Sequence, residues 1–257
     1  MNLLRRDSTA SGREPDARGG PARPVDVWAI ALDVPQATLN RLGAWLSQEE
    51  RARAARFTFH RDRRRFVVSH AAMRAILAAE VGCDPRELRF VTNAFGKPAL
   101  GDPPFEVGFN LAHSGELALC AVARGVEVGI DLEAVREVPD AEAILRGSFA
   151  PLEVDDWLQV PAERRQEAFL RLWTCKEAWL KACGRGLSLP IHHSEIRVSG
   201  EVASFRSVNG SVADAGRWSL RLLTPAVGYV AAVCAEAPEF HLRLREWVVA
   251  PAGGAGL

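Results

Sequence analysis

Residues 117–133 read LALCAVARGVEVGIDLE, and this stretch sets the expectations for the fold. Two apolar runs, residues 117–123 and 126–132, are joined by Arg124-Gly125. Glycine tolerates a positive φ, so a two-residue connection of this kind predicts an antiparallel β-hairpin.

The second apolar run ends in two carboxylates, Asp131 and Glu133. Side chains alternate between the faces of a strand, so these two project together and away from the apolar face. Paired carboxylates repel one another, but they suit a hard divalent cation that prefers oxygen ligands. The alternative is an ordinary exposed, acidic strand end.

Helical patterns flank this stretch on both sides. Residues 47–59 predict one helix, and residues 63–80 predict a longer one that Gly82 ends. Residues 169–183 predict another long helix, ended by Gly184. Strands are expected at 25–32, 195–198, 218–223 and 228–235.

Strand, helices and further strands thus follow one another twice along the chain, which predicts a duplicated α+β unit. We expect an N-terminal half at 25–125 and a C-terminal half at 126–249. Residues 1–24 are rich in Arg, Gly, Pro, Ser and Asp and predict a disordered tail. Residues 250–257 are expected to form a second, flexible tail.

Composition excludes few classes of function. Lys and Arg balance Asp and Glu at 32 each, so net charge indicates no nucleic-acid partner. The five cysteines form no CxxC pair and are expected to be reduced thiols. No secretory signal or membrane-spanning segment is recognisable, so we expect a cytoplasmic protein. Seven arginines crowd residues 51–65, where they form either an anion-binding surface or a solvated helix face.

Three more groups of residues are candidates for a site. Glu177 and Lys181 lie one turn apart on the predicted helix, either as a surface ion pair or as part of a site. His113 and Ser114 lie just before the predicted hairpin, where a strand ends and backbone amides become free. His113 is either a donor to a phosphate or a loop histidine whose hydrogen bonds are satisfied within the protein. Lys97 lies in Gly-Lys-Pro, which is not a Walker loop.

Four motifs occur in a fixed order: GKP at 96–98, FNLAHSG at 109–115, GIDLE at 129–133, and FxxxWTxKEAxxKxxGxGL at 169–187. Together they resemble the surfactin-type (Sfp-type) 4'-phosphopantetheinyl transferases, and the similarity covers about residues 25–235. The resemblance implies a pseudo-dimer of two similar α+β halves, each an antiparallel sheet with helices, and an active site in the cleft between them.

The resemblance also implies a reaction. The phosphopantetheine arm of coenzyme A passes to a serine of an apo acyl or peptidyl carrier protein, as in secondary-metabolite biosynthesis, and 3',5'-adenosine bisphosphate is released. Mg²⁺ is the implied cofactor, and no nucleic acid or membrane takes part. A chain containing both halves of the cleft is expected to be a monomer.

Roles follow position by position from the same resemblance. Glu177 is implied as catalytic base, and Lys181 as the group that assists the leaving group. The implied metal ligands are Asp131, Glu133 and Glu177, and the implied coenzyme A contacts are Arg53, Lys97, Pro98, Asn110, His113, Ser114 and Lys181.

The sequence departs from the family pattern at Ala112, where many relatives carry a hydroxyl residue, and at Phe66, where some carry a phosphate-contacting threonine. These differences bear on coenzyme A affinity. Two other functions stay open: a non-catalytic protein that binds coenzyme A or a carrier protein, and a metal-dependent nuclease that uses the same acids.

Overall fold

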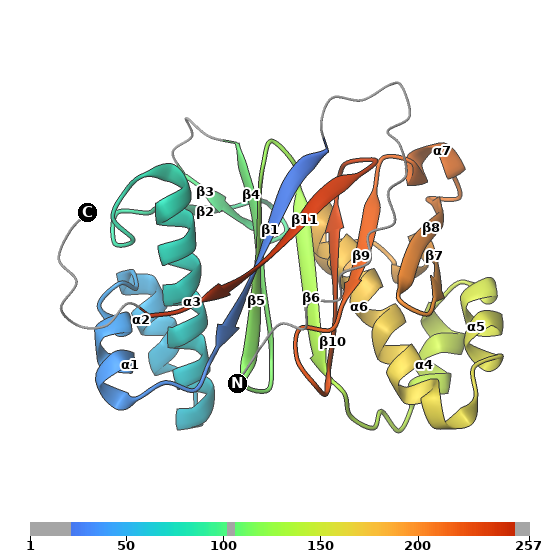
Figure 1. Cartoon of the computed structure of the whole chain (residues 1–257), viewed down its shortest axis with the longest axis horizontal. Coiled ribbons are helices and arrows are strands. Elements are labelled where there is room, and N and C mark those ends of the chain that lie inside the picture. Colours follow the sequence, from blue (N-terminus) through green and yellow to red (C-terminus); the bar gives the residue numbers. More distant parts are fainter. Residues whose placement is uncertain (1–21, 102–105, 250–257) are drawn as a thin grey trace.

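The computed structural model describes residues 22–101 and 106–249. It confirms the α+β class and divides into two groups of elements, each combining a β-sheet with a long helix. The two sheets stand next to one another in the middle of the molecule, with α1–α3 at one end and α4–α6 at the other (Figure 1). The predicted tails at 1–24 and 250–257 lie almost entirely outside the described residues.

The first sheet has the strand order β11-β1-β5-β4. Its strands are β1 (Arg23–Ala31), β4 (Val107–Ser114), β5 (Leu117–Arg124) and β11 (Phe240–Trp247). β1 starts two residues before the predicted strand. It pairs antiparallel with β5 and parallel with β11, so the last strand of the chain joins the sheet of the first half.

Three helices belong to this half: α1 (Gln36–Gly43), α2 (Gln48–Ala55) and α3 (His60–Val81). α3 packs on β4 and β5, and α1 and α2 pack on α3. Ser47 and Glu50 form a capping box that begins α2, where a helix start was predicted. That helix was expected to reach residue 59, but it ends at Ala55, and Phe59 is the N-cap of α3. α3 ends at Gly82, whose φ is 78°, as predicted.

The second sheet has the order β6-β10-β9 and is antiparallel. Its strands are β6 (Val128–Ala134), β9 (Ser219–Leu223) and β10 (Tyr229–Ala235). The long helix α6 (Arg165–Cys183) packs on β6 and β10 and ends at Gly184, whose φ is 64°. The smaller elements are α4 (Ala141–Ser148), α5 (Pro151–Leu158), α7 (Val212–Ala215), and the hairpins β2–β3 (Phe90–Thr92, Pro98–Leu100) and β7–β8 (Ser194–Ser199, Val202–Val208).

The predicted hairpin between residues 117–123 and 126–132 was wrong. β5 pairs with β4 through the turn at Gly115 and with β1 on its other edge, so neither of its edges is free for β6. β6 belongs to the second sheet instead. The Arg124-Gly125 connection therefore crosses from one sheet to the other, and the Gly125 N–H donates to the Glu106 carbonyl at 2.6 Å.

The two sheets are joined by a shared apolar cluster. It contains Val25 and Val27 of β1, Leu119 of β5, Ile130 of β6 and Val233 of β10, all at most 2 % exposed. β4 and the chain before β6 also approach closely, because a Cβ on Gly108 would lie 2.1 Å from the Val126 carbonyl oxygen. Packing between β4 and β6 thus fixes the position of the two halves relative to one another.

The cysteines and the helix lengths were also considered in the sequence predictions. All five cysteines are free, three of them buried. Within the described residues no helix is long and apolar enough to cross a membrane.

Candidate active site

β6 presents its polar face to α6. Gly129 contacts the helix so closely that a Cβ there would lie 2.1 Å from the Ala178 carbonyl oxygen. Asp131 and Glu133 follow Gly129 at intervals of two residues and so share its face. The alternation predicted from the sequence therefore holds, and both carboxylates lie beside α6.

Asp131 is 7 % exposed and has one ionic partner. Lys181 Nζ lies 2.5 Å from Asp131 Oδ1, whereas Asp131 Oδ2 is buried without any hydrogen-bond partner. Burial raises the pKa of Asp131 to about 6; Lys181 opposes this shift, and Glu177 and Glu133 add to it. One oxygen of a buried, crowded carboxylate is thus left unsatisfied.

Glu133 is held from two sides. Arg136 Nη1 donates to Glu133 Oε2 at 2.6 Å, and Ser114 Oγ donates to the same oxygen at 3.3 Å. Ser114 Oγ also accepts from the Ala134 N–H at 3.0 Å, which links the end of β4 to the end of β6. Arg136 was not predicted as a site residue, because an i,i+3 relation such as that to Glu133 is common on any surface.

Glu177 and Lys181 line a pocket of about 300 Å³ between α6 and the β2–β3 loop. Lys97, Pro98 and Asn110 line the same pocket, so five predicted site residues meet there. Glu177 is half-buried, and its carboxylate has no hydrogen-bond or ion-pair partner among the described residues.

Lys97 and Asn110 also connect the two halves. Lys97 Nζ donates to Glu127 Oε2 at 2.5 Å and to the Ala182 carbonyl, at the end of α6, at 2.8 Å. Asn110 Oδ1 accepts from the Ile130 N–H at 3.0 Å, which ties β4 to β6. Lys97 was predicted only as a phosphate contact, and Glu127 was not singled out at all. The ion pair between Glu127 and Lys97 depends on the tertiary fold, and no local sequence pattern predicts it.

A neighbouring pocket of about 580 Å³ shares Pro98 and Asn110 with the first. Arg53 and His113 line it, and the Arg53 guanidinium lies 5.2 Å from the centre of the Phe66 ring. The pKa of His113 is lowered by loss of surrounding water and by the charges of Lys181 and Arg65.

His70 stacks on the Phe66 ring. Its ring centre lies 3.8 Å from that of Phe66, and His70 Nδ1 lies 3.0 Å from the Phe66 carbonyl oxygen. Burial and the charge of Arg53 lower the pKa of His70 to about 4, so the ring is neutral near pH 7.

A second lysine of α6 has a different environment. Lys176 is fully buried and lies 2.6 Å from Glu153 Oε1, which is also fully buried. Lys176 Nζ donates to the carbonyls of Ile191 and Ser194 as well. Glu153 accepts from the N–H groups of Ala150 at 2.9 Å and Ile196 at 2.7 Å.

The predicted site residues therefore gather at one seam of the molecule. Five line the first pocket, and Arg53 and His113 line the second. Asp131 bonds to Lys181, and Glu133 and Ser114 bond to each other at the ends of β6 and β4. Within the described residues, no group of three or more His, Cys, Asp or Glu side chains already stands in metal-binding positions.

Comparisons with known proteins identify the family of the chain. A family model described as the 4'-phosphopantetheinyl transferase superfamily matches residues 127–234, and one for the N-terminal part of such transferases matches residues 34–124. The boundary between the two matches falls where the chain crosses from β5 to β6.

Individual relatives point to the same family. The chain is 42% identical to 4'-phosphopantetheinyl transferase HetI of Nostoc over 81% of this chain and 86% of that protein. It is 29% identical to 4'-phosphopantetheinyl transferase Sfp of Bacillus subtilis over 84% of this chain and 94% of that protein. The match to holo-acyl-carrier-protein synthase of Thermotoga maritima covers 43% of this chain and 62% of that protein, at 24% identity and a TM-score of 0.33. By the match to HetI and the two family models, the chain belongs to the 4'-phosphopantetheinyl transferase superfamily and is a phosphopantetheinyl transferase.

Proposed function

We propose that this transferase moves the phosphopantetheine arm of coenzyme A to a serine of an apo carrier protein, with Mg²⁺ as cofactor, in the seam between the two halves. The names of the relatives support the transfer. The observation that carries the finer proposal is the buried and unpaired Oδ2 of Asp131. Such an atom is costly unless a ligand satisfies it.

The donor set fits a magnesium ion. Asp131, Glu133 and Glu177 offer carboxylate oxygens, which Mg²⁺ prefers, and all three interact electrostatically. Burial raises the pKa of Asp131, repulsion by Glu177 and Glu133 adds to the shift, and a divalent cation would offset both effects. Bound there, Mg²⁺ would neutralise charge on the pyrophosphate of coenzyme A.

The cationic side chains around the two pockets suit the phosphates of coenzyme A. Lys181 lies at the carboxylates, whereas Arg53 and His113 line the larger pocket. Pro98 and Asn110 belong to both pockets and would form the floor on which the molecule lies. Lys97 and Ser114 would act next to them, Lys97 on a phosphate and Ser114 through its bond to Glu133.

The residues of α6 then divide the proton transfers. The carrier serine attacks the β-phosphorus, and Glu177 accepts its proton directly or through a water molecule, because this carboxylate has no competing partner among the described residues. The bond from the β-phosphorus to the bridging oxygen breaks. Lys181, one turn further along the helix, stabilises or protonates the departing 3',5'-adenosine bisphosphate.

Intact-mass spectrometry of an apo carrier protein tests the proposal. With coenzyme A and Mg²⁺ the carrier should gain one phosphopantetheine arm, and a chelator should prevent the gain. Glu177→Gln should bind Mg²⁺ and coenzyme A yet transfer slowly, whereas undiminished transfer by this variant would remove Glu177 as the base. Transfer that persists in chelator would remove the metal from the proposal.

A non-catalytic protein that binds coenzyme A or a carrier is the second candidate. It predicts measurable coenzyme A binding without a mass change on any carrier type. The clustering of Glu177 and Lys181 with the carboxylates favours the enzyme, because simple binding requires no base. We also propose that the enzyme is a monomer, since one chain supplies both sides of the seam.

A further inference from the structure

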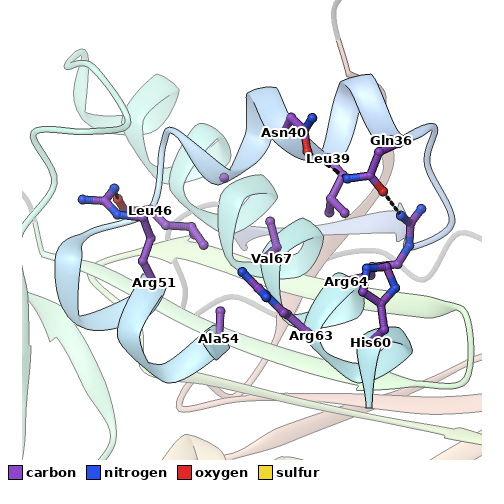
Figure 2. A pocket seen from close by; sticks show the side chains of 11 residues that line it. Gln36, Leu39, Asn40, Leu46, Arg51, Ala54, His60, Arg63, Arg64 and Val67 are labelled. Carbon is purple, nitrogen blue, oxygen red and sulfur yellow. Dashed lines mark hydrogen bonds between the residues drawn. The ribbon is translucent and has the colours of Figure 1, made fainter. Parts of the chain in front are cut away.

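A second hollow lies on the side of α2 that faces away from the proposed active site. Its volume is about 450 Å³, and residues of α1, α2 and α3 line it (Figure 2). α2 separates the two spaces, because Glu50 and Arg53 line the active-site pocket while Arg51 and Ala54 line the hollow. The transfer reaction uses none of the residues around this hollow.

The floor of the hollow is apolar. Leu39, Leu46, Ala54 and Val67 contribute to it and are each at most 9 % exposed. Polar side chains stand around this floor, and among the described residues none of those that line the hollow is an aspartate or glutamate. The polar lining side chains are Gln36, Asn40, Arg51, His60, Arg63 and Arg64.

The positive charges at the rim are not neutralised by carboxylates. Arg64 donates to Gln36 Oε1 at 2.7 Å and to the Val34 carbonyl at 2.6 Å, and Arg51 donates to the Leu46 carbonyl. All these acceptors are neutral. The guanidinium of Arg63 has no hydrogen-bond or ion-pair partner among the described residues.

Other arginines of α3 behave differently. Arg65 forms an ion pair with Glu116, and Arg74 forms one with Glu50 at 2.7 Å. The absence of acids is therefore specific to the hollow and is not a property of the whole helix. Figure 2 shows Arg63 reaching from α3 over the floor, beside Ala54 and Val67.

We propose that this hollow binds a small amphipathic oxyanion, with a carboxylate or phosphate head group on a short apolar body. Arg63 and its neighbours would donate charge-assisted hydrogen bonds to the head group. The apolar body would cover the leucine and valine side chains of the floor. The volume and the mixture of an apolar floor with a few polar groups are typical of small-molecule sites.

Calorimetric titration of the full chain at low ionic strength tests the site with four probes. Octanoate and octyl phosphate carry both parts of the proposed ligand, octan-1-ol lacks the charge, and inorganic phosphate lacks the apolar body. We expect saturable 1:1 binding of at least one amphipathic anion, about tenfold or more tighter than octan-1-ol and inorganic phosphate. The tighter of the two anions identifies the head group. Equal binding of octan-1-ol, or no binding of either anion up to its solubility, overturns the proposal.

Two matched variants of α3 locate the binding. Arg63→Gln removes the unpaired charge and should weaken the anion by about fivefold or more. Arg61→Gln removes an exposed arginine of the same helix that does not line the hollow and lies 3.6 Å from Asp62. The Arg61→Gln control should bind the anion as tightly as the unchanged protein does. Both variants should have the thermal midpoint of the unchanged protein. Binding that is the same in Arg63→Gln and the unchanged protein overturns the proposal.

Discussion

Helix α6 carries two lysine–carboxylate pairs, and they are built in opposite ways. Lys176 and Glu153 are both fully buried. Backbone carbonyls accept further hydrogen bonds from Lys176, and backbone N–H groups donate hydrogen bonds to Glu153. Lys181 and Asp131 lie at the seam between the halves, where Lys181 is 31 % exposed and Asp131 Oδ2 has no partner.

The difference separates a structural pair from a pair that is prepared for a ligand. A satisfied buried pair fixes its surroundings, here the contact of α6 with α5 and with the start of β7. An unsatisfied carboxylate carries a cost that a bound cation can offset. Glu177 lies next to Lys176 in sequence and lines the pocket with Lys181, so the first pair holds the helix that presents the second.

The largest effect is expected from the pair of Lys181 and Asp131. Asp131→Ala should abolish Mg²⁺-dependent transfer, because it removes a proposed metal ligand and no contact of the apolar core. The thermal midpoint should not fall, since burial already disfavours the ionised form of this carboxyl. Intact-mass spectrometry measures the transfer, and a full-rate variant would remove Asp131 from the site.

Changes to the pair of Lys176 and Glu153 should alter stability. Lys176→Met leaves Glu153 buried without its counter-charge and should lower the free energy of unfolding by about 3 to 5 kcal/mol. Urea unfolding measures the loss. The double variant Lys176→Met with Glu153→Leu should recover much of it, because no unpaired charge remains. If the free energy of unfolding of Lys176→Met is within about 1 kcal/mol of that of the unchanged protein, this pair does not fix the helix.

Gly129 sets the spacing between β6 and both pairs. Gly129→Ala would force its Cβ against the backbone of Ala178 and Ala182, so we expect a loss of about 1 to 3 kcal/mol in stability together with slower transfer. Gly147→Ala in α4 is the matched control, because nothing lies within 4 Å of that position. A Gly129→Ala variant as stable and active as this control would show that the close approach is not required.

The smallest expected effect is the contribution of His70, beside the larger pocket, to the pH dependence of stability. The pKa of His70 falls from 6.5 to about 4 on folding, so between these values the unfolded chain binds more protons and stability decreases as pH falls. The loss between pH 7 and pH 6 should be about 1 kcal/mol or less. Urea midpoints of the unchanged protein and of His70→Gln measure it, with the exposed His241→Gln as control. An equal slope in His70→Gln would assign the pH dependence to another group.

Local patterns predicted the parts of the fold that depend on local physics. The ends of α3 and α6 follow from glycines that adopt a positive φ at Gly82 and Gly184. The common face of Asp131 and Glu133 follows from strand alternation. The partner of each strand did not follow, because the pairing of β5 with β1 and β4, and the return of β11 to β1, are decided by the packing of distant segments.

The same division applies to the site. Residue types and spacing indicated the carboxylates and Lys181 as candidate site residues. They could not predict that Asp131 Oδ2 has no hydrogen-bond partner. The bonds of Lys97 to Glu127 and of Arg136 to Glu133 also lacked a signal, since they depend on where neighbouring elements end. The seven arginines of residues 51–65 look alike in sequence, yet the structure divides them between the active-site pocket, the second hollow and the surface.

The most direct test of the account is calorimetric titration of coenzyme A into the unchanged protein and into Asp131→Asn, each with Mg²⁺ and with chelator. The account predicts that Mg²⁺ strengthens coenzyme A binding to the unchanged protein and has no such effect on Asp131→Asn, in which the unpaired carboxylate oxygen is gone. The same Mg²⁺ enhancement in both proteins would contradict the claim that Asp131 is kept unsatisfied for a metal ion and its phosphate ligand.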